Sequence, residues 1–386
     1  IANAITTGSI SGVLLSTASN LVINTTGVVS VGVVGTDIGT VTVTNSGGTT
    51  FTGTVDAGTA VLTATTGTIS FQGNLTLSAG LTAAATGYNV SMTGAANTIA
   101  GTTSFLNTGS LTLGDASTDS FGFTGGVSKV VGAKNLAGTI TAAGTGAIDL
   151  GTAGLVTVTA DTTIGGTSTG AITLFTTVVN DGFTLTLGTG IANAVTTGTV
   201  SGVALLAVSD LVINTTGVVS VGVVGTDIGT VTVTNSGGAT FTGTVDAVSA
   251  VLTATTGTIG FLGNVTLTTG LTAAAAGYNV SMTGAANTIA GATSFLNTGS
   301  LTLGDANTDS FAFSGGVSKV VGAKNLAGTV SAAGIGAIDL GTAGLVTVTA
   351  NTTIGGTGTG AITLFNTVIN DGFTLTLGTG IANAVT

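Results

Sequence analysis

The sequence predicts an all-β protein, a parallel β-solenoid (β-helix) with coils of about 19 residues and about ten coils in each 190-residue repeat. Three observations predict this fold. Short segments alternate β-branched and polar residues, a long internal repeat contains a shorter period, and small residues are abundant, with 66 Gly in 386 residues. Period-two alternation interrupted by Gly is typical of strands joined by tight turns.

The long repeat divides the chain into copies. Residues 1–190 and 191–380 align without a gap and differ at 28 of 190 positions, and 381–386 begin a third copy. The segment 11–20, SGVLLSTASN, differs most from its counterpart, SGVALLAVSD. We therefore expect one solenoid copy over 1–190, a second over 191–380 and the start of a third at 381–386, with no linker at residue 190.

A shorter period lies inside each copy. Every nineteenth position, counted from Thr6, holds Ser or Thr in eight of ten cases, and the next step, Thr196, opens the second copy. The ten positions are Thr6, Thr25, Thr44, Thr63, Thr82, Gly101, Ser120, Thr139, Val158 and Thr177. This spacing predicts about twenty coils, stacked about 4.8 Å apart.

The strands within each coil are short. They are read from VTVT at 41–44, LTL at 75–77 and 111–113, VTVT at 156–159 and FTLTL at 183–187. Asn-Asp-Gly at 180–182 and Ser-Gly-Gly at 46–48 supply residues that tolerate positive φ in tight turns. A chain of antiparallel β-sandwiches is the alternative. The short strands, the short period and the many small residues favour the solenoid.

Composition restricts the chemistry. The chain has no His, Cys, Trp, Pro, Arg or Glu, and its four bases are Lys129, Lys134, Lys319 and Lys324. It therefore lacks an imidazole base, a thiolate nucleophile and the usual ligands of zinc or haem. Four lysines and a net charge of −10 do not match the clustered cations of a nucleic-acid-binding protein. We expect no enzyme activity, catalytic residue, metal site or cofactor, no nucleic-acid partner, and no transmembrane segment in this sequence.

The repeated phrases resemble those of repetitive bacterial surface proteins, namely large adhesins, autotransporter passengers and filamentous-haemagglutinin-like chains. The phrases are GNLTLSAG (73–80), TLTLGTGI (184–191) and GAIDLGTAGLVTVTA (146–160). The resemblance covers the whole chain and lies in composition and rhythm, without a diagnostic motif. It implies a right-handed β-helix, secretion and a role as a stalk, sheath or adhesive fibre.

Two acidic patterns are candidate cation sites. Asp115 and Asp119 in GDASTDSF, with Asp305 and Asp309 in the second copy, could offer oxygen ligands to calcium, although the EF-hand order and the Gly-rich nonapeptide of calcium-binding β-rolls are both absent. A solvated turn is the simpler interpretation. Asp37 and Asp56, like Asp227 and Asp246, are separated by one step of the short period. They would stack on adjacent coils if the period held locally, whereas variation in coil length would separate them.

Other polar residues have equally simple interpretations. Asp115 and Lys134 are also separated by one step of the short period, which predicts a stacked surface ion pair. Thr-x-Thr pairs at 42/44, 157/159 and 184/186 resemble the threonine arrays of ice-binding solenoids, but outward-facing strand residues give the same pattern. Tyr88 and Tyr278, the only tyrosines, are the candidates for a recognition surface.

These observations predict a structural protein, a segment of an extracellular fibre or adhesin stalk on a bacterial cell surface, as in a biofilm. Its partners would be other copies, associated laterally or end to end, because an unfinished final coil leaves backbone groups open. The alternatives are a surface-layer lattice subunit, or an adhesive module that binds ice, a glycan or another surface.

Overall fold

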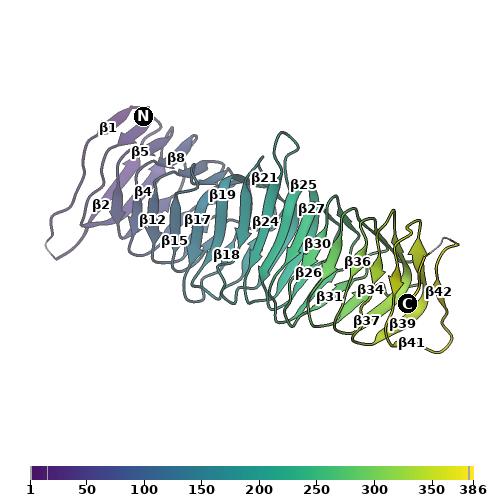
Figure 1. Ribbon diagram of the computed structural model, residues 1–386. Helices are drawn as coiled ribbons and strands as arrows, with labels where there is room; N and C mark the ends of the chain where they lie inside the picture. Colours follow the sequence, from purple (N-terminus) through teal and green to yellow (C-terminus); the bar gives the residue numbers. More distant parts are fainter. Residues whose placement is uncertain (1, 15, 381–382) are drawn as a thin grey trace. The chain divides into compact units, whose positions relative to one another are not determined.

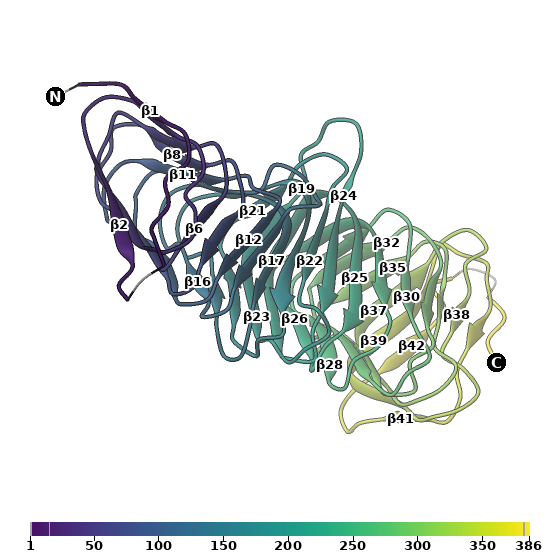
Figure 2. The same cartoon turned by 90° about the vertical axis from the view of Figure 1, so that its left-hand side faces the viewer.

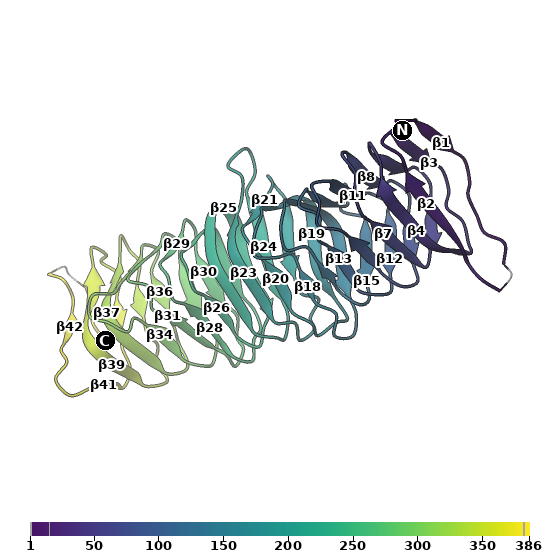
Figure 3. The same cartoon turned by 180° about the vertical axis from the view of Figure 1, so that it is seen from behind.

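The computed structural model describes residues 2–14, 16–380 and 383–386, which contain 42 strands and no helix. The fold is a parallel β-solenoid of about 18 coils, about 21 residues apart. The chain divides into two units, Ile1–Thr197 and Gly198–Thr386, which are described separately. Figures 1 and 3 show, within each unit, strands of successive coils stacked side by side.

Each coil of the first unit contributes up to three short strands, and each strand pairs in parallel with its counterparts in the neighbouring coils. Three ladders result. Ladder 1 contains β1 (Ile5–Thr7), β3 (Val29–Val31), β5 (Thr49–Phe51), β8 (Thr68–Phe71), β11 (Asn89–Met92), β14 (Leu111–Leu113), the first parts of β17 (Lys134–Ala142) and β19 (Val156–Gly166), and β21 (Thr177–Val179). Ladder 2 contains β6 (Val55–Ala57), β9 (Leu75–Leu77), β12 (Ala96–Ile99), β15 (Ser120–Phe123), the second parts of β17 and β19, and β22 (Thr184–Leu187). Ladder 3 contains β2 (Ser19–Asn24), β4 (Ile38–Asn45), β7 (Thr59–Leu62), β10 (Leu81–Ala83), β13 (Thr103–Phe105), β16 (Val127–Ser128), β18 (Ile148–Asp149), β20 (Ile172–Leu174) and the start of β23 (Val195–Ser201).

The predicted fold class is confirmed, and the coil length is corrected. Paired residues in adjacent coils are between 19 apart, as for Ser120 and Thr139, and 24 apart, as for Ile148 and Ile172. Thr6 pairs with Ser30 and not with Thr25. The predicted average of about 19 residues and ten coils per copy are therefore wrong, because the corners of many coils are longer than that average allows.

A 190-residue copy does not contain a whole number of coils. The ladder 1 column that starts at Ile5 reaches Thr177 after eight coils. The chain then passes through β22 in ladder 2, and Val195 pairs with Ile172 in ladder 3. Ile5 and Val195 are equivalent in the sequence repeat, yet they belong to different ladders. One copy thus spans about eight and two-thirds coils.

Alternation along each strand builds the core. In ladder 1 the inward column through Val31, Phe51, Phe71 and Met92 is at most 1 % exposed, and the Phe51 and Phe71 rings stack with centroids 4.8 Å apart. The middle residues of the same strands face outward and are mostly hydroxylic. This outward column is Thr6, Ser30, Thr50, Ser70, Ser91, Thr112, Asn135, Thr157 and Val178.

Polar side chains at the corner between ladders 3 and 1 satisfy the backbone groups that the strands leave unpaired. Ser46 and Thr65, on successive coils, form a hydroxyl–hydroxyl bond of 2.8 Å, and Thr65 Oγ1 lies 2.6 Å from the carbonyl oxygen of Ser46. Further along, Asn107 Nδ2 donates to the carbonyl of Tyr88 at 2.9 Å. Buried backbone groups need such partners because water cannot reach them.

The second unit repeats this organisation, with parallel strands and the same inward and outward alternation. Its strands are β24 (Ser209–Asn214), β25 (Val219–Asn235), β26 (Ala239–Phe241), β27 (Val245–Leu252), β28 (Thr258–Phe261), β29 (Val265–Leu267), β30 (Leu271–Ala273), β31 (Asn279–Met282), β32 (Ala286–Ile289), β33 (Thr293–Phe295), β34 (Leu301–Leu303), β35 (Ser310–Phe313), β36 (Val317–Ser318), β37 (Lys324–Ala332), β38 (Ile338–Asp339), β39 (Val346–Gly356), β40 (Ile362–Thr363), β41 (Thr367–Ile369) and β42 (Leu375–Leu377). Among the residues described, no helix could span a membrane.

Candidate functional site

The most unusual side chains of the molecule are its four lysines, all of which are 0 % exposed. Lys134 is the first residue of β17 and lies in an inward column, paired with Leu111 on one side and Val156 on the other. Lys129 directly follows β16, and its backbone N–H donates to the carbonyl of Asp149 at 2.8 Å. Lysine is rarely buried without a paired charge, so these positions require an explanation.

The ammonium groups bind backbone carbonyls of neighbouring coils. Lys129 Nζ donates to the carbonyl oxygens of Asn107 and Gly109, the latter at 2.9 Å, both on the preceding coil. Lys134 Nζ donates to the carbonyl of Ala153, on the following coil, at 2.6 Å. We call Lys129, Lys134 and these three carbonyls the lysine corner.

The second unit contains the same arrangement. Lys319 Nζ donates to the carbonyls of Asn297 and Gly299, and Lys324 Nζ donates to that of Ala343 at 2.6 Å.

The local sequence explains why lysines occupy this place. Several other coils place a polar side chain inside this corner, such as Ser46, Thr65 and Asn107, but here the corner residues are Val-Val-Gly-Ala at 130–133. This corner offers no side-chain donor, so the two flanking lysines supply donors from the strands. The predicted surface ion pair of Asp115 with Lys134 is wrong, because Lys134 points into the core.

Burial makes the charged form of these lysines costly. Desolvation, and secondly the charge of Lys134, lowers the pKa of Lys129 to about 8. Desolvation also lowers the pKa of Lys134, while the nearby Asp149 carboxylate acts in the opposite direction. The second unit behaves alike: desolvation and the charge of Lys324 lower the pKa of Lys319 to about 8.

The acidic turn at Asp115 and Asp119 is a backbone cap. Asp119 is 4 % exposed, and its Oδ2 accepts hydrogen bonds from the N–H groups of Asp115 at 2.9 Å and Ala116 at 3.1 Å. Asp309 binds Asp305 and Ala306 in the same way. Among the described residues, no three acidic side chains gather to hold a metal ion. Asp115 is exposed, as a solvated turn requires, whereas Asp119 is buried as the cap of that turn.

Asp37 and Asp56 lie on adjacent coils and line one surface depression of about 260 Å³, together with Ser78. Asp37 has a positive φ of 65°, and its Oδ2 is buried without a hydrogen-bond partner, as is that of Asp227. Asp56 is exposed and pairs with Thr76. Two carboxylates are fewer ligands than a calcium ion requires.

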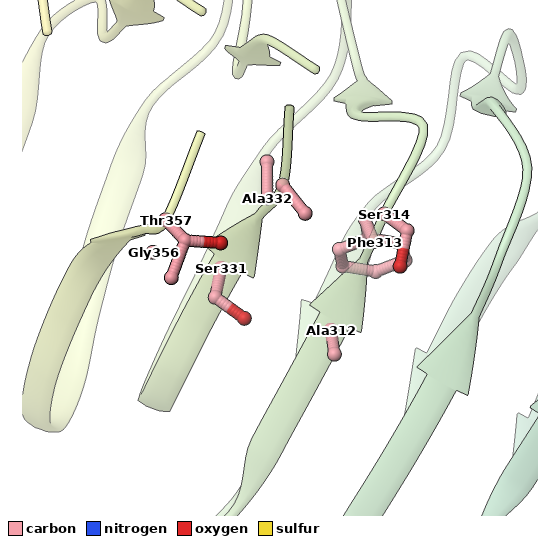
Figure 4. A pocket seen from close by; sticks show the side chains of 8 residues that line it. Ala312, Phe313, Ser314, Ser331, Ala332, Gly356 and Thr357 are labelled. Carbon is pink, nitrogen blue, oxygen red and sulfur yellow. The ribbon is translucent and has the colours of Figure 1, made fainter. Parts of the chain in front are cut away.

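Shallow grooves lie where β15 ends in the first unit and where its sequence equivalent β35 ends in the second. One, of about 220 Å³, is shown in Figure 4 with the side chains of Phe313, Ser314, Ser331 and Thr357. Its counterpart in the first unit, of about 190 Å³, is lined by Gly122, Phe123, Thr124, Thr141, Ala142, Ala143, Gly166 and Thr167. No titratable side chain lines either groove, so neither offers a general acid or base.

The tyrosines are not available as a recognition surface. Tyr88 and Tyr278 are 0 % exposed, and their hydroxyls donate to the carbonyls of Leu62 and Leu252 at 2.8 Å. Burial raises the pKa of each to about 12. The threonine columns are also mixed: Thr42 pairs with Val22 and Val61, so its column is not a continuous hydroxyl array.

Sequence reasoning did not predict one exposed apolar feature, the loop between β23 and β24. Figure 2 shows this loop projecting from the stacked strands of its unit. Leu205 is 73 % exposed and Leu206 is 97 % exposed. The signal in the sequence is VALLAV at 203–208, an apolar run without alternation, in the segment that differs most between the copies.

No family model, curated protein or solved structure matches this chain.

Proposed function

We propose that the chain is a structural segment of an extracellular bacterial fibre or adhesin stalk, without catalytic activity. The observation that carries this proposal is the parallel ladder system of each unit. In each unit, coil after coil repeats the same backbone pairing around an aliphatic core. In such an array each coil contacts mainly its neighbours, so stability accumulates with the number of coils.

The distribution of charge restricts how copies of the chain could associate in a fibre. All four lysines are buried, whereas acidic residues such as Asp56, Asp115 and Asp161 are exposed. The accessible side-chain charge is therefore carried by aspartates. Two copies would repel each other weakly through water and salt, so lateral contact would have to use uncharged faces. End-to-end strand pairing avoids that repulsion for most of the surface.

Electron microscopy of the purified chain and of the native material tests this proposal. We expect filaments or stalks whose length increases with the number of 190-residue copies. A two-dimensional lattice would instead support a surface-layer subunit, and particles whose length is independent of copy number would contradict the fibre proposal.

The exposed loop favours a second candidate function, an adhesive module. Leu205 and Leu206 present apolar surface to solvent, and exposed apolar patches commonly mark contact sites. Beads coated with the chain should bind an alkyl-coated surface more strongly than a hydroxyl-coated one, and Leu205→Ser/Leu206→Ser should remove that difference. Equal binding of the variant would eliminate the loop as the adhesive element.

A further inference from the structure

The strands of the ladders are nearly interchangeable, which creates a register problem. The sequence LTL occurs at 75–77 in ladder 2, where Leu75 pairs with Val55, and again at 111–113 in ladder 1, where Leu111 pairs with Val90. The same short sequence is thus accepted on two ladders. Strands that lack distinguishing side chains specify their pairing weakly and are prone to slip.

The lysine corner is the exception to this uniformity. Lys129 reaches back to carbonyls 22 and 20 residues earlier in the chain, and Lys134 reaches forward to one 19 residues later. Three successive coils are therefore connected by two side chains. Each 190-residue copy contains one such pair, so no other coil of the copy offers the same two side chains.

We propose that the lysine corner fixes the register of the coils around it, so that these lysines provide specificity of folding and not stability. If a neighbouring coil shifts, a buried ammonium group loses its carbonyl acceptors while it remains in the core. An uncompensated buried charge is far more costly than the exchange of one aliphatic contact for another. Misregistered coils are therefore selectively disfavoured.

The charged surroundings are consistent with this role. The charge of Lys134 acts on the pKa of Lys129, and the charge of Asp149 acts on the pKa of Lys134. The flanking strands β13 and β14 carry no charged residue, and Lys134 pairs on β19 with Val156. The Asp149 carboxylate accepts the N–H of Gly151 at 2.8 Å. The backbone carbonyls are thus the partners that depend on correct stacking.

A disulfide reporter can measure the register, since the chain contains no cysteine. The outward residues Ser104 and Ser128 pair across adjacent coils, with their hydroxyl oxygens 3.4 Å apart. In the second unit Ser294 and Ser318 form the same pair at 3.4 Å. Ser→Cys substitution at either pair should give a disulfide after refolding and brief oxidation only where the coils are in register.

The first experiment compares Lys129→Met/Lys134→Met with the parent in both reporters. We expect at least a twofold loss of the disulfide at 104–128, no loss at 294–318, and an unchanged or higher urea midpoint. Leu111→Met, in the same inward column as Lys134, is the matched control and should keep the full yield. An unchanged yield at 104–128 in the double variant would overturn the proposal.

The second experiment needs no lysine substitution, so it decides the question even if the double variant does not fold. The parent reporter is refolded under reducing conditions at pH 7 or at pH 10.5, and both samples are then oxidised at one common pH. At pH 10.5 the Lys129 amine, whose pKa is about 8, is largely neutral, and a misplaced neutral amine costs less than an ammonium group. We expect a lower disulfide yield after refolding at pH 10.5. Equal yields would contradict a role for the lysine charge.

Discussion

At the scale of single residues, the polar side chains inside the coils are there to satisfy the backbone. Thr65 and Asn107 donate to carbonyls at one corner, where Ser46 Oγ accepts the N–H of Gly48. Lys129 and Lys134 donate to carbonyls where the corner has only Val, Gly and Ala. Lysine is the more costly donor at this position, because burial removes more hydration free energy from an ammonium group than from a hydroxyl or an amide. Its cost should be visible in the pH dependence of stability.

We predict that the protein becomes more stable between pH 8 and pH 10. The pKa of Lys129 is about 8 in the folded chain and 10.5 ordinarily, so in this interval the unfolded chain binds more protons. The free energy of unfolding then rises with pH, by up to about 1.4 kcal/mol per pH unit for each such lysine. Below about pH 8 both states are protonated and the slope disappears.

Urea unfolding at several pH values measures this trend. Lys129→Met/Lys319→Met should show a much smaller slope, and a parent midpoint that falls between pH 8 and pH 10 would contradict the assignment.

The Asp119 cap gives a second residue-scale prediction. Asp119→Ala leaves the N–H groups of Asp115 and Ala116 without their charged acceptor, which should cost about 1–3 kcal/mol. Asp115→Ala, at an exposed carboxylate, should change stability by less than about 0.5 kcal/mol. Added calcium should not shift the parent midpoint. A calcium-dependent increase that is lost in Asp119→Ala would restore the metal-site interpretation of this turn.

At the scale of the elements, the corners decide how each coil is closed. In β17 the chain passes from ladder 1 to ladder 2 within one strand, and the register shifts between Leu136 and Gly138. Gly138 has a φ of 82°, and a Cβ there would lie 2.2 Å from the carbonyl oxygen of Asp119 on the preceding coil. The close approach of two backbones therefore excludes a side chain at this bend.

We predict that Gly138→Ala destabilises the coil by more than about 2 kcal/mol, because positive φ and a backbone clash act together. Gly144→Ala is the matched control. Its φ is 60° with no atom within 4 Å of the added Cβ, so only the backbone strain of about 1–2 kcal/mol applies. Hydrogen exchange of peptides covering 134–142 measures the local effect. Equal effects of both substitutions would show that the clash is relieved by movement of the neighbouring coil.

The elements also show what the sequence can and cannot reveal. Alternation in LTL at 111–113 correctly predicts a strand with two inward leucines, because period two is a local property. The spacing of coils is not local, since it depends on corner length, and a division of each copy into ten coils that average 19 residues misses the longer coils. The outward residues Thr6, Ser30, Thr50 and Ser70 contain the true spacing, but threonine is too common to mark it.

The surface position predicted for Lys134 is wrong for a related reason. KNL at 134–136 occupies the same ladder positions as LTL at 111–113, so the alternation places Lys134 inward. The general preference of lysine for the surface points the other way and is the weaker guide here. The deciding fact, the missing corner donor at 130–133, depends on which residues form the corner and becomes evident only when the coils are aligned.

At the scale of the whole molecule, accessibility to proteases reports the integrity of the coils. Trypsin cleaves after Lys or Arg, and the chain has four lysines and no arginine. All four are 0 % exposed. We predict that the native protein resists trypsin completely and that urea makes it cleavable at all four sites. Subtilisin should cut first in the exposed loop at 204–208. Rapid tryptic cleavage without denaturant would show that the lysine corner opens in the native state.

The fractional number of coils in one copy has a consequence for how such a gene can change. Duplication copies whatever length of DNA lies between its breakpoints. A solenoid with distinct sides would tolerate only inserts after which the following strands return to their own side. Here each copy begins on the ladder where the preceding one ends, since Val195 pairs with Ile172 and Val385 pairs with Ile362, so a copy need not contain a whole number of coils. Unequal recombination can therefore lengthen or shorten the array at many breakpoints, which makes length a heritable trait that is easily adjusted.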